Sequence, residues 1–405
     1  EKFVNKLIIT PWKNGILSMI QENGAPTVLD AEPRGQHTIL GNIYIGKVKH
    51  IVKNINAAFV DIGDHLTGYL SLGDGCIHFA SQNLPQRPVC EGDEIVVQVE
   101  KEAVKTKALV LTSNLNFTGR YCVLTAGKNQ IGFSSKIHGT LWKNQIRPFL
   151  EEQKDEDFGI IVRTNAESAD IQTVLYELRQ LKQIYRAVMN AASHRTCFSL
   201  LYRSYPPYIT AVRDSVRNSL DAIITDDREI FENMKEYLSL YQPEDIEKLT
   251  FYEDSLLPLS KLYRLEKALD DALDKRVWLK SGGYLVIEPT EALVVIDVNT
   301  GKYSGKKNLR ETILKINCEA AVEISRQLRL RNLSGIILVD FIDMEAQADK
   351  KALMSLLTEK VSKDPVKTVV VDMTKLNLVE LTRKKIRRPL TEQIKQLKSM
   401  PEALI

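Results

Sequence analysis

Short stretches that alternate between hydrophobic and polar residues fill the chain between residues 40 and 112. Glycine-rich turns separate these stretches, as expected for β-strands joined by tight connections. The predicted strands are 41–48, 57–63, 68–70, 95–99 and 108–112. Strands this short and this closely spaced favour a small β-barrel.

The pattern changes in the rest of the chain. Residues 119–214 combine β-like stretches with one long amphipathic helix from about 170 to 189. The Tyr-Pro-Pro-Tyr sequence at 205–208 predicts a boundary. Helical patterns dominate from 214 to 276, and strands and helices alternate from residue 278 onward, which is typical of a layered α/β domain. We therefore expect an α/β multidomain protein.

Composition narrows the class of protein. The 405 residues are 44% hydrophobic and 26% charged, an ordinary globular composition that excludes disorder, collagen and coiled coil. This length allows two or three domains. The 55 Lys and Arg residues nearly balance the 52 Asp and Glu residues, so any affinity for nucleic acid must come from local patches.

Cysteine and histidine usage excludes several kinds of site. The five cysteines are widely spread and never spaced as C-x-x-C, so neither a disulfide framework nor a zinc site is expected, and a reducing cytoplasm fits best. Residues 1–20 lack a basic segment before an apolar run, and no stretch is apolar enough to span a membrane, so we expect a soluble, untargeted, cytoplasmic protein. No histidine follows His194, so a site in the C-terminal half needs chemistry without histidine unless the N-terminal half folds onto it.

The most informative segment is a predicted hairpin at 282–299. Its second strand ends in Asp297-Val298-Asn299, and the two-residue period of a strand places Asp297 and Asn299 on the same side. A helix is predicted from about 309 to 331, with Asn308 as its N-cap, followed by an apolar strand that ends at Asp343.

A strand, a helix and a second strand in this order favour parallel pairing, which brings both strand ends to one edge of the sheet. Asp297 and Asp343 should therefore meet there. Carboxylates without a nearby His or Cys suit Mg²⁺, or alternatively Mn²⁺, better than zinc. Asn299 is expected to orient a carboxylate, a water or the substrate, and the Gly- and Lys-rich loop 301–307 is suited to a phosphate. The arrangement predicts a metal-dependent phosphodiesterase.

A structural interpretation of the same residues stays open. Asp297 and Asn299 would then only cap the turn after their strand, and Asp340 and Asp343 would do the same at the next strand end. The pairing of two such strand ends with a Lys-rich loop favours the metal site over this interpretation.

Aromatic and basic residues indicate a surface for nucleic acid. In the segment 57–63, an apolar inner face leaves Phe59 on the outside of the predicted barrel, where Tyr69 and Lys107 are candidates to join it. Aromatic rings beside a cation are how proteins stack the bases of single-stranded RNA. The alternative is that both rings belong to the core. The basic run 383–388 is a second candidate phosphate contact, although such runs are more often solvated faces.

Taken together, the motifs resemble the bacterial ribonuclease E/G endoribonucleases over nearly the whole chain. The matching segments are 41–47, 58–61, 161–164, 294–299, 319–321, 324–331 and 340–344. The resemblance implies an RNase H-like subdomain, an inserted S1-type OB barrel, a 5′-sensor domain, a DNase I-like catalytic domain and a C-terminal tail. Their expected ranges are 1–35 with 215–278, then 36–118, 119–214, 279–390 and 391–405.

The resemblance also implies roles for individual residues. Asp297 and Asp343 match the Mg²⁺ ligands, and Asn299 matches the residue that helps orient the attacking water or the scissile phosphate. Phe59, Tyr69 and Lys107 match positions that grip single-stranded RNA. The residues that match a 5′-monophosphate pocket are Gly119, Val123, Arg163 and Thr164, with Lys375 where the family tends to place an additional Arg. Lys keeps the charge but loses the bidentate fork, which implies weaker dependence on a 5′-monophosphate.

One departure concerns assembly. The family usually carries a C-P-x-C zinc link after the position of Pro389, and residues 390–405 contain no cysteine. We therefore expect no zinc and, if the chain forms a homo-oligomer, one without a zinc link.

The predicted function is Mg²⁺-dependent endonucleolytic cleavage of single-stranded RNA, in rRNA processing and mRNA decay, by attack of water that leaves 5′-phosphate and 3′-hydroxyl ends. Two rival functions stay open. One is a non-catalytic RNA-binding or ribosome-maturation factor. The other is a metal phosphodiesterase acting on DNA or a small phosphoester.

Overall fold

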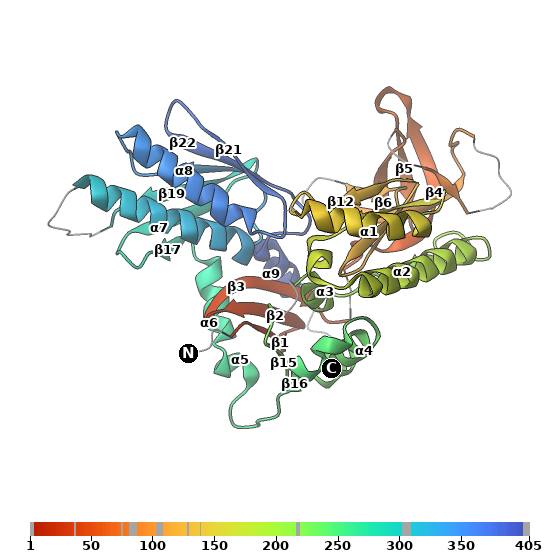
Figure 1. The fold of residues 1–405 in the computed structure, drawn as a ribbon, viewed down its shortest axis with the longest axis horizontal. Coiled ribbons are helices and arrows are strands. Elements are labelled where there is room, and N and C mark those ends of the chain that lie inside the picture. Colours follow the sequence, from red (N-terminus) through yellow and green to blue (C-terminus); the bar gives the residue numbers. More distant parts are fainter. Residues whose placement is uncertain are drawn as a thin grey trace. The chain divides into compact units, whose positions relative to one another are not determined.

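The computed structural model describes most of the chain as two compact units, 1–36 with 220–405, and 37–219 (Figure 1). The described residues are 4–35, 38–73, 76–80, 87–102, 108–127, 129–137, 139–215, 219–301 and 309–399. This division is coarser than the predicted subdomain layout, which stays a prediction. No helix among the described residues has an apolar stretch of the length needed to cross a bilayer.

The unit 37–219 contains the predicted barrel. Its strands are β4 (Ile43–Val52), β5 (Ala57–Asp61), β6 (Thr67–Ser71), β9 (Leu109–Thr112) and β8 (Glu94–Lys101), paired in this order. Strand β8 also pairs with β4, which closes the ring. Two short strands pair with the barrel strands from outside the ring: β7 (His78–Phe79) with β8, and β14 (Leu200–Tyr202) with β4. A short 3-10 helix (Lys53–Ile55) precedes β5. Inward residues such as Val60, Leu70 and Val97 are fully buried and form the barrel core, so the barrel prediction is confirmed.

The same unit holds a second, four-stranded sheet with helices packed on it. The strands are β10 (Asn116–Thr118), β11 (Cys122–Ala126), β13 (Phe158–Val162) and β12 (Ile131–Phe133), in this order. The helices are α1 (Thr140–Gln153), α2 (Ile171–Ala192), α3 (Pro207–Asp214) and the 3-10 helix Thr164–Ser168. Helix α2 is the predicted amphipathic helix. The Asp170 side chain caps it by accepting a hydrogen bond from the Thr173 amide, and its buried face packs on the sheet.

In the other unit, 4–35 form strands for which the hydrophobic pattern made no prediction. Strands β1 (Lys6–Trp12), β2 (Gly15–Glu22) and β3 (Ala25–Pro33) are antiparallel neighbours. On the far side of β1, β15 (Ala222–Thr225) and β16 (Leu249–Phe251) add in parallel, so the segment predicted as helical also supplies two short strands. The helices associated with this part of the chain are α4 (Arg228–Tyr241), the 3-10 helix Pro243–Lys248, α5 (Leu259–Leu262), α6 (Leu265–Leu273) and α9 (Leu390–Ser399).

The second sheet of this unit carries the predicted hairpin. Its strands are β17 (Arg276–Trp278), β18 (Tyr284–Pro289), β19 (Leu293–Asn299), β20 (Gly335–Asp340), β22 (Leu378–Arg383) and β21 (Thr368–Met373), in this order. Strands β18 and β19 are antiparallel, and α7 (Leu309–Leu330) connects β19 to its parallel neighbour β20. Helices α7 and α8 (Gln347–Ser362) lie side by side (Figure 1) and share a core with this sheet. The predicted strand, helix and parallel strand are therefore confirmed, but β20 ends at Asp340 and not, as predicted, at Asp343. The expected N-cap Asn308 lies outside the described residues.

Candidate functional site

The ends of β19 and β20 bring acidic side chains to one edge of the sheet. Along β19, burial alternates: Val294, Ile296 and Val298 are buried, whereas Asp297 and Asn299 are half-exposed on the opposite face. This is the two-residue period expected from the sequence. Asp297 lies directly opposite Asp340 in the parallel pairing. Both acids therefore stand at the carboxyl ends of neighbouring strands.

Neighbouring amides orient two of the carboxylates. The Asn299 Nδ2 donates to Asp297 Oδ2 at 2.7 Å, and the Asn377 Nδ2 donates to Asp343 Oδ1 at 3.1 Å. Lys350 in turn donates from Nζ to Asn377 Oδ1 at 2.7 Å. Sequence reasoning anticipated an orienting role for Asn299. It missed Asn377 and Lys350, because nothing in the local pattern shows that they lie beside Asp343.

A buried amide sets the path of the chain that carries Asp343. Asn317 on α7 is fully buried, and its side chain donates to the Ile342 carbonyl at 2.8 Å and accepts from the Ile342 amide at 3.1 Å. The strand has already ended at Asp340, so these two bonds replace ladder bonds that the chain has lost. Asp343 thus leaves the sheet at a position determined by α7.

The acidic residues at this edge interact electrostatically. The pKa of Asp340 is raised, first by partial burial and then by the negative charges of Asp297 and Asp343. The Asp340 carboxylate is therefore close enough to be repelled by both Asp297 and Asp343. None of the three makes an ion pair with a described Lys or Arg, and none accepts a backbone N–H from a described residue, which a turn-capping role requires. We call Asp297, Asp340 and Asp343 the acidic edge.

The donor set of the acidic edge is compatible with Mg²⁺. Within the described part of the chain, no three His, Cys, Asp or Glu side chains converge closely enough to bind a metal ion on their own. Mg²⁺ is usually bound by one or two carboxylates and keeps several waters or phosphate oxygens as its other ligands. A pair of carboxylates that makes no ion pair with a described Lys or Arg fits that requirement.

The barrel presents an aromatic pair on its outer face. Phe59 on β5 and Tyr69 on β6 are direct cross-strand partners, both half-buried, with ring centroids 6.3 Å apart in an edge-to-face arrangement. Their neighbours Ala58, Val60 and Leu70 point inward. The rings thus stand outside the barrel core, as the pattern predicts. Lys107 lies outside the described residues.

Four of the residues matched to a 5′-monophosphate pocket, Gly119, Val123, Arg163 and Thr164, lie on or next to strands of the four-stranded sheet. Arg163 follows β13, and its Nη1 donates to the Gly119 carbonyl at 2.5 Å and to Asp214 Oδ1 at 2.8 Å. Val123 pairs with Ile161 on β13. Thr164 is exposed, with its hydroxyl 3.1 Å from the Ser134 hydroxyl. Lys375, also exposed, lies in the turn between β21 and β22 of the other unit.

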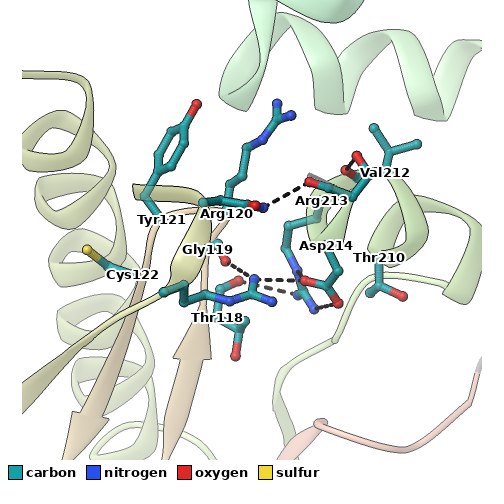
Figure 2. Close-up of polar contacts among 12 residues, drawn as sticks. Thr118, Gly119, Arg120, Tyr121, Cys122, Thr210, Val212, Arg213 and Asp214 are labelled. Atoms are coloured by element: carbon teal, nitrogen blue, oxygen red, sulfur yellow. Dashed lines mark hydrogen bonds and ion pairs between the residues drawn. The ribbon is translucent and has the colours of Figure 1, made fainter. Parts of the chain in front are cut away.

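Asp214 is bound by two guanidinium groups. Figure 2 shows Asp214 and Arg213 beside Thr118 and Gly119. Arg213 donates to both carboxylate oxygens, from Nε at 2.9 Å and from Nη2 at 3.0 Å. Burial raises the pKa of Asp214, but the positive charges of Arg213 and Arg163 and their hydrogen bonds outweigh it and lower the pKa to about 2. We call Asp214, Arg163 and Arg213 the arginine clamp; sequence reasoning missed Asp214 and Arg213.

A second carboxylate holds the turn that follows Gly119. Glu177 on α2 is buried and accepts backbone hydrogen bonds from Arg120, Tyr121 and Cys122 at 2.7, 2.8 and 2.9 Å. A side chain at Gly119 would collide with the Glu177 carboxylate. The Gly119 position is therefore closed to any larger residue.

The three arginines of the basic run 383–388 form ion pairs or hydrogen bonds with other residues of the protein. Arg383 is buried and paired with Asp364 at 2.7 Å, and its Nη1 donates to Asn332 and to the Leu333 carbonyl. Arg387 pairs with Asp30 at 3.0 Å. The interpretation of this run as a phosphate contact is wrong for Arg383, because its guanidinium is enclosed. The run is not simply a solvated face either.

Comparisons with known proteins show which family the chain resembles. The family model described as the ribonuclease E/G family matches residues 116–386. Ribonuclease G of Haemophilus influenzae is 35% identical over 396 residues, covering 95% of this chain and 80% of that protein. Ribonuclease G of Escherichia coli is 34% identical, covering 90% and 77%. Ribonuclease E of a Nostoc species is 34% identical, covering 94% of this chain but only 56% of its own length.

Proposed function

Because the chain belongs to the ribonuclease E/G family, it is an endoribonuclease, and we propose that it cleaves single-stranded RNA with Mg²⁺ held at the acidic edge. In this proposal water attacks the phosphate and leaves 5′-phosphate and 3′-hydroxyl ends. Mn²⁺ is the alternative ion. rRNA processing and mRNA decay in the cytoplasm are the expected cellular roles.

The observation that carries the metal proposal is that Asp297, Asp340 and Asp343 make no ion pair with a Lys or Arg of the described residues. Asp297 and Asp343 would hold the ion, which when bound supplies charge to the scissile phosphate and lowers the pKa of a coordinated water. The chain's own residues do the positioning. Asn299 orients the Asp297 carboxylate and Asn377 orients that of Asp343. Asn317 holds the backbone of Ile342, directly before Asp343.

Two other groups of residues would position the RNA. Phe59 and Tyr69 offer ring faces and edges on which unstacked bases pack, which suits single strands because every base has a π-face. Arg163 and Thr164, with Gly119 and Val123 beside them, supply a guanidinium and a hydroxyl for a 5′-terminal phosphate. The roles of Lys107 and Lys375, and a homo-oligomer without a zinc link, stay part of the proposal.

The finer domain layout is also proposed. Three antiparallel strands followed by two parallel ones, in the order β3-β2-β1-β15-β16, support the RNase H-like subdomain. The closed ring of β4, β5, β6, β9 and β8 supports the S1-type OB barrel. The sheet containing β19 and β20, covered by α7 and α8, supports the DNase I-like catalytic domain, and the sheet behind Arg163 supports the 5′-sensor.

Incubating the protein with a single-stranded RNA in Mg²⁺ or in EDTA, and mapping the product ends, tests this function. We expect chelator-sensitive cleavage that leaves 5′-phosphate and 3′-hydroxyl termini. Products with 2′,3′-cyclic phosphates, or activity that persists in EDTA, would contradict the mechanism. A DNA oligomer of the same sequence separates the proposal from a general phosphodiesterase. RNA binding without any cleavage would favour the non-catalytic RNA-binding factor.

A further inference from the structure

Arg163 is held by one corner of its guanidinium group. Both of its printed side-chain bonds leave from Nη1, one to the Gly119 carbonyl and one to Asp214. Its Nε and Nη2 make no hydrogen bond with the described residues, and the side chain is 25% exposed. The Nε–Nη2 edge is a two-donor fork of the kind that binds a phosphate in a bidentate manner. The contacts therefore leave the phosphate-binding edge unused.

The Asp214 carboxylate is fixed independently of Arg163. It lies at the C-terminal end of α3, a short helix anchored by the buried side chains of Tyr208 and Val212. Arg213 grips both of its oxygens and also donates from Nη1 to the Thr118 carbonyl at 3.3 Å. The Asp214 carboxylate is thus held in place by Arg213 and α3, without a contribution from Arg163.

The end of α3 is itself connected to the segment that carries Arg163. Asn165, two residues after Arg163, donates from Nδ2 to the Ser215 carbonyl at 2.9 Å. Arg163 also donates its backbone N–H to the Tyr121 carbonyl at 2.8 Å. Both the backbone and the guanidinium of Arg163 are therefore hydrogen-bonded to residues that lie far from it in the sequence.

Charge alone would allow the opposite role. A carboxylate beside Arg163 is an internal anion, and it could compete with an RNA phosphate for that guanidinium. The geometry argues against competition, because Asp214 uses only Nη1 and shares that nitrogen with Gly119. Within the arginine clamp, two guanidiniums face one carboxylate, and the nearby Glu177 carboxylate is occupied by three backbone N–H donors rather than by Arg163.

We propose that Asp214 is a positioning residue for recognition of a 5′-terminal phosphate: it fixes Arg163 by Nη1 so that the Nε–Nη2 edge is available to the phosphate. This inference rests on the proposed role of Arg163 as a 5′-phosphate ligand. It assigns Asp214 to selection between RNA 5′ ends rather than to cleavage.

The test compares one single-stranded RNA with a 5′-monophosphate against the same RNA with a 5′-hydroxyl. The preference, defined as the ratio of kcat/KM for the two substrates, is measured for the full chain and for Asp214→Asn, with Asp157→Asn as the matched control. Asp157 is an exposed acid of the same unit that makes no side-chain hydrogen bond with described residues. We expect Asp214→Asn to reduce the preference about tenfold through a higher KM for the phosphorylated RNA, the size expected for one charge-assisted hydrogen bond.

Asp157→Asn should leave cleavage of both RNAs unchanged. A loss in Asp214→Asn that is confined to the 5′-monophosphate RNA supports positioning, whereas misfolding lowers cleavage of both RNAs in parallel. Asp214→Glu keeps the charge and should restore part of the preference even if Asp214→Asn folds poorly. In an Arg163→Ala background, Asp214→Asn should have no additional effect, because the two residues act as one unit.

The remaining outcomes overturn the inference in different ways. A preference that rises in Asp214→Asn would establish competition instead of positioning, and an unchanged preference would show that Asp214 has no role in recognition. A wild-type protein that does not distinguish the two RNAs would overturn the proposed 5′-phosphate pocket as well.

Discussion

The acidic edge and the arginine clamp treat negative charge in opposite ways. At the acidic edge, none of the three carboxylates pairs with a described cation, and the pKa of Asp340 is raised by burial and by the charges of Asp297 and Asp343. In the arginine clamp, burial also opposes the charge of Asp214, yet two guanidiniums lower its pKa to about 2. Among the described residues, the first arrangement makes no ion pair with a cation. The second contains its own cations and has positive charge left for an external anion.

The largest expected effect comes from the acidic edge. Replacing Asp297 or Asp343 with Asn should lower kcat/KM for RNA cleavage by about a thousandfold or more, because the metal would lose one of its two carboxylate ligands. RNA binding, measured by fluorescence anisotropy, should change little.

The matched control for these variants is Asp372→Asn, an exposed acid on β21 of the same sheet. It should retain wild-type cleavage. Full activity in Asp297→Asn would show that the acidic edge is not the catalytic site, and loss of binding together with cleavage would indicate misfolding.

Asp364 lies in the same unit as the acidic edge but is paired with an arginine. Its replacement should therefore change stability. Asp364 and Arg383 are 3% and 4% exposed and pair at 2.7 Å. Asp364→Ala leaves the buried Arg383 charge without an anionic partner and should lower the free energy of unfolding by about 3–5 kcal/mol. Urea denaturation measures this change. A loss below about 1 kcal/mol would mean that solvent reaches the guanidinium.

Low pH should remove the stabilisation that Asp214 gains from its ion pairs with Arg163 and Arg213. Its folded-state pKa of about 2 lies below the value of about 3.9 for an unfolded Asp, so its stabilisation is present above about pH 4 and is lost as the pH falls toward 2. Because the side chain is 35% exposed, we expect a contribution of only about 1 kcal/mol. Denaturation at several pH values should show that the free energy of unfolding depends less on pH in Asp214→Asn than in the wild type. Equal slopes for the two proteins would contradict the ion pairs.

The smallest effect has the opposite sign. Asp340→Asn removes the charge that Asp297 and Asp343 repel and, because solvent screens this exposed side chain, should raise the free energy of unfolding in EDTA by only about 0.5 kcal/mol. Thermal unfolding without metal measures it. A variant less stable than the wild type would show that Asp340 has a favourable partner and that the acidic edge is already compensated.

Periodicity explains what could be predicted from the sequence. The barrel strands, the hairpin and the side shared by Asp297 and Asn299 all follow from local alternation. The convergence of Asp297 and Asp343 follows from the rule for parallel strands joined by a helix. Each of these inferences uses residues within one element or one supersecondary unit.

The errors and omissions have a different physical origin. Asn377 beside Asp343, and Asp214 beside Arg163, are side-chain contacts between elements far apart in sequence, which no local period encodes. Arg383 was misassigned because a run of cations does not show which of them is buried against an acid such as Asp364. The strands at 4–35 carry enough buried hydrophobic residues, such as Ile8 and Leu17, to have been found by the same reasoning.

The central claim is that the acidic edge binds a divalent cation, and a crystal of the protein grown with Mn²⁺ tests it most directly. The anomalous difference map should contain a peak about 2.2 Å from carboxylate oxygens of both Asp297 and Asp343, a normal oxygen-to-metal distance for such ions. A crystal with full Mn²⁺ occupancy elsewhere and no peak between these two residues would contradict the account.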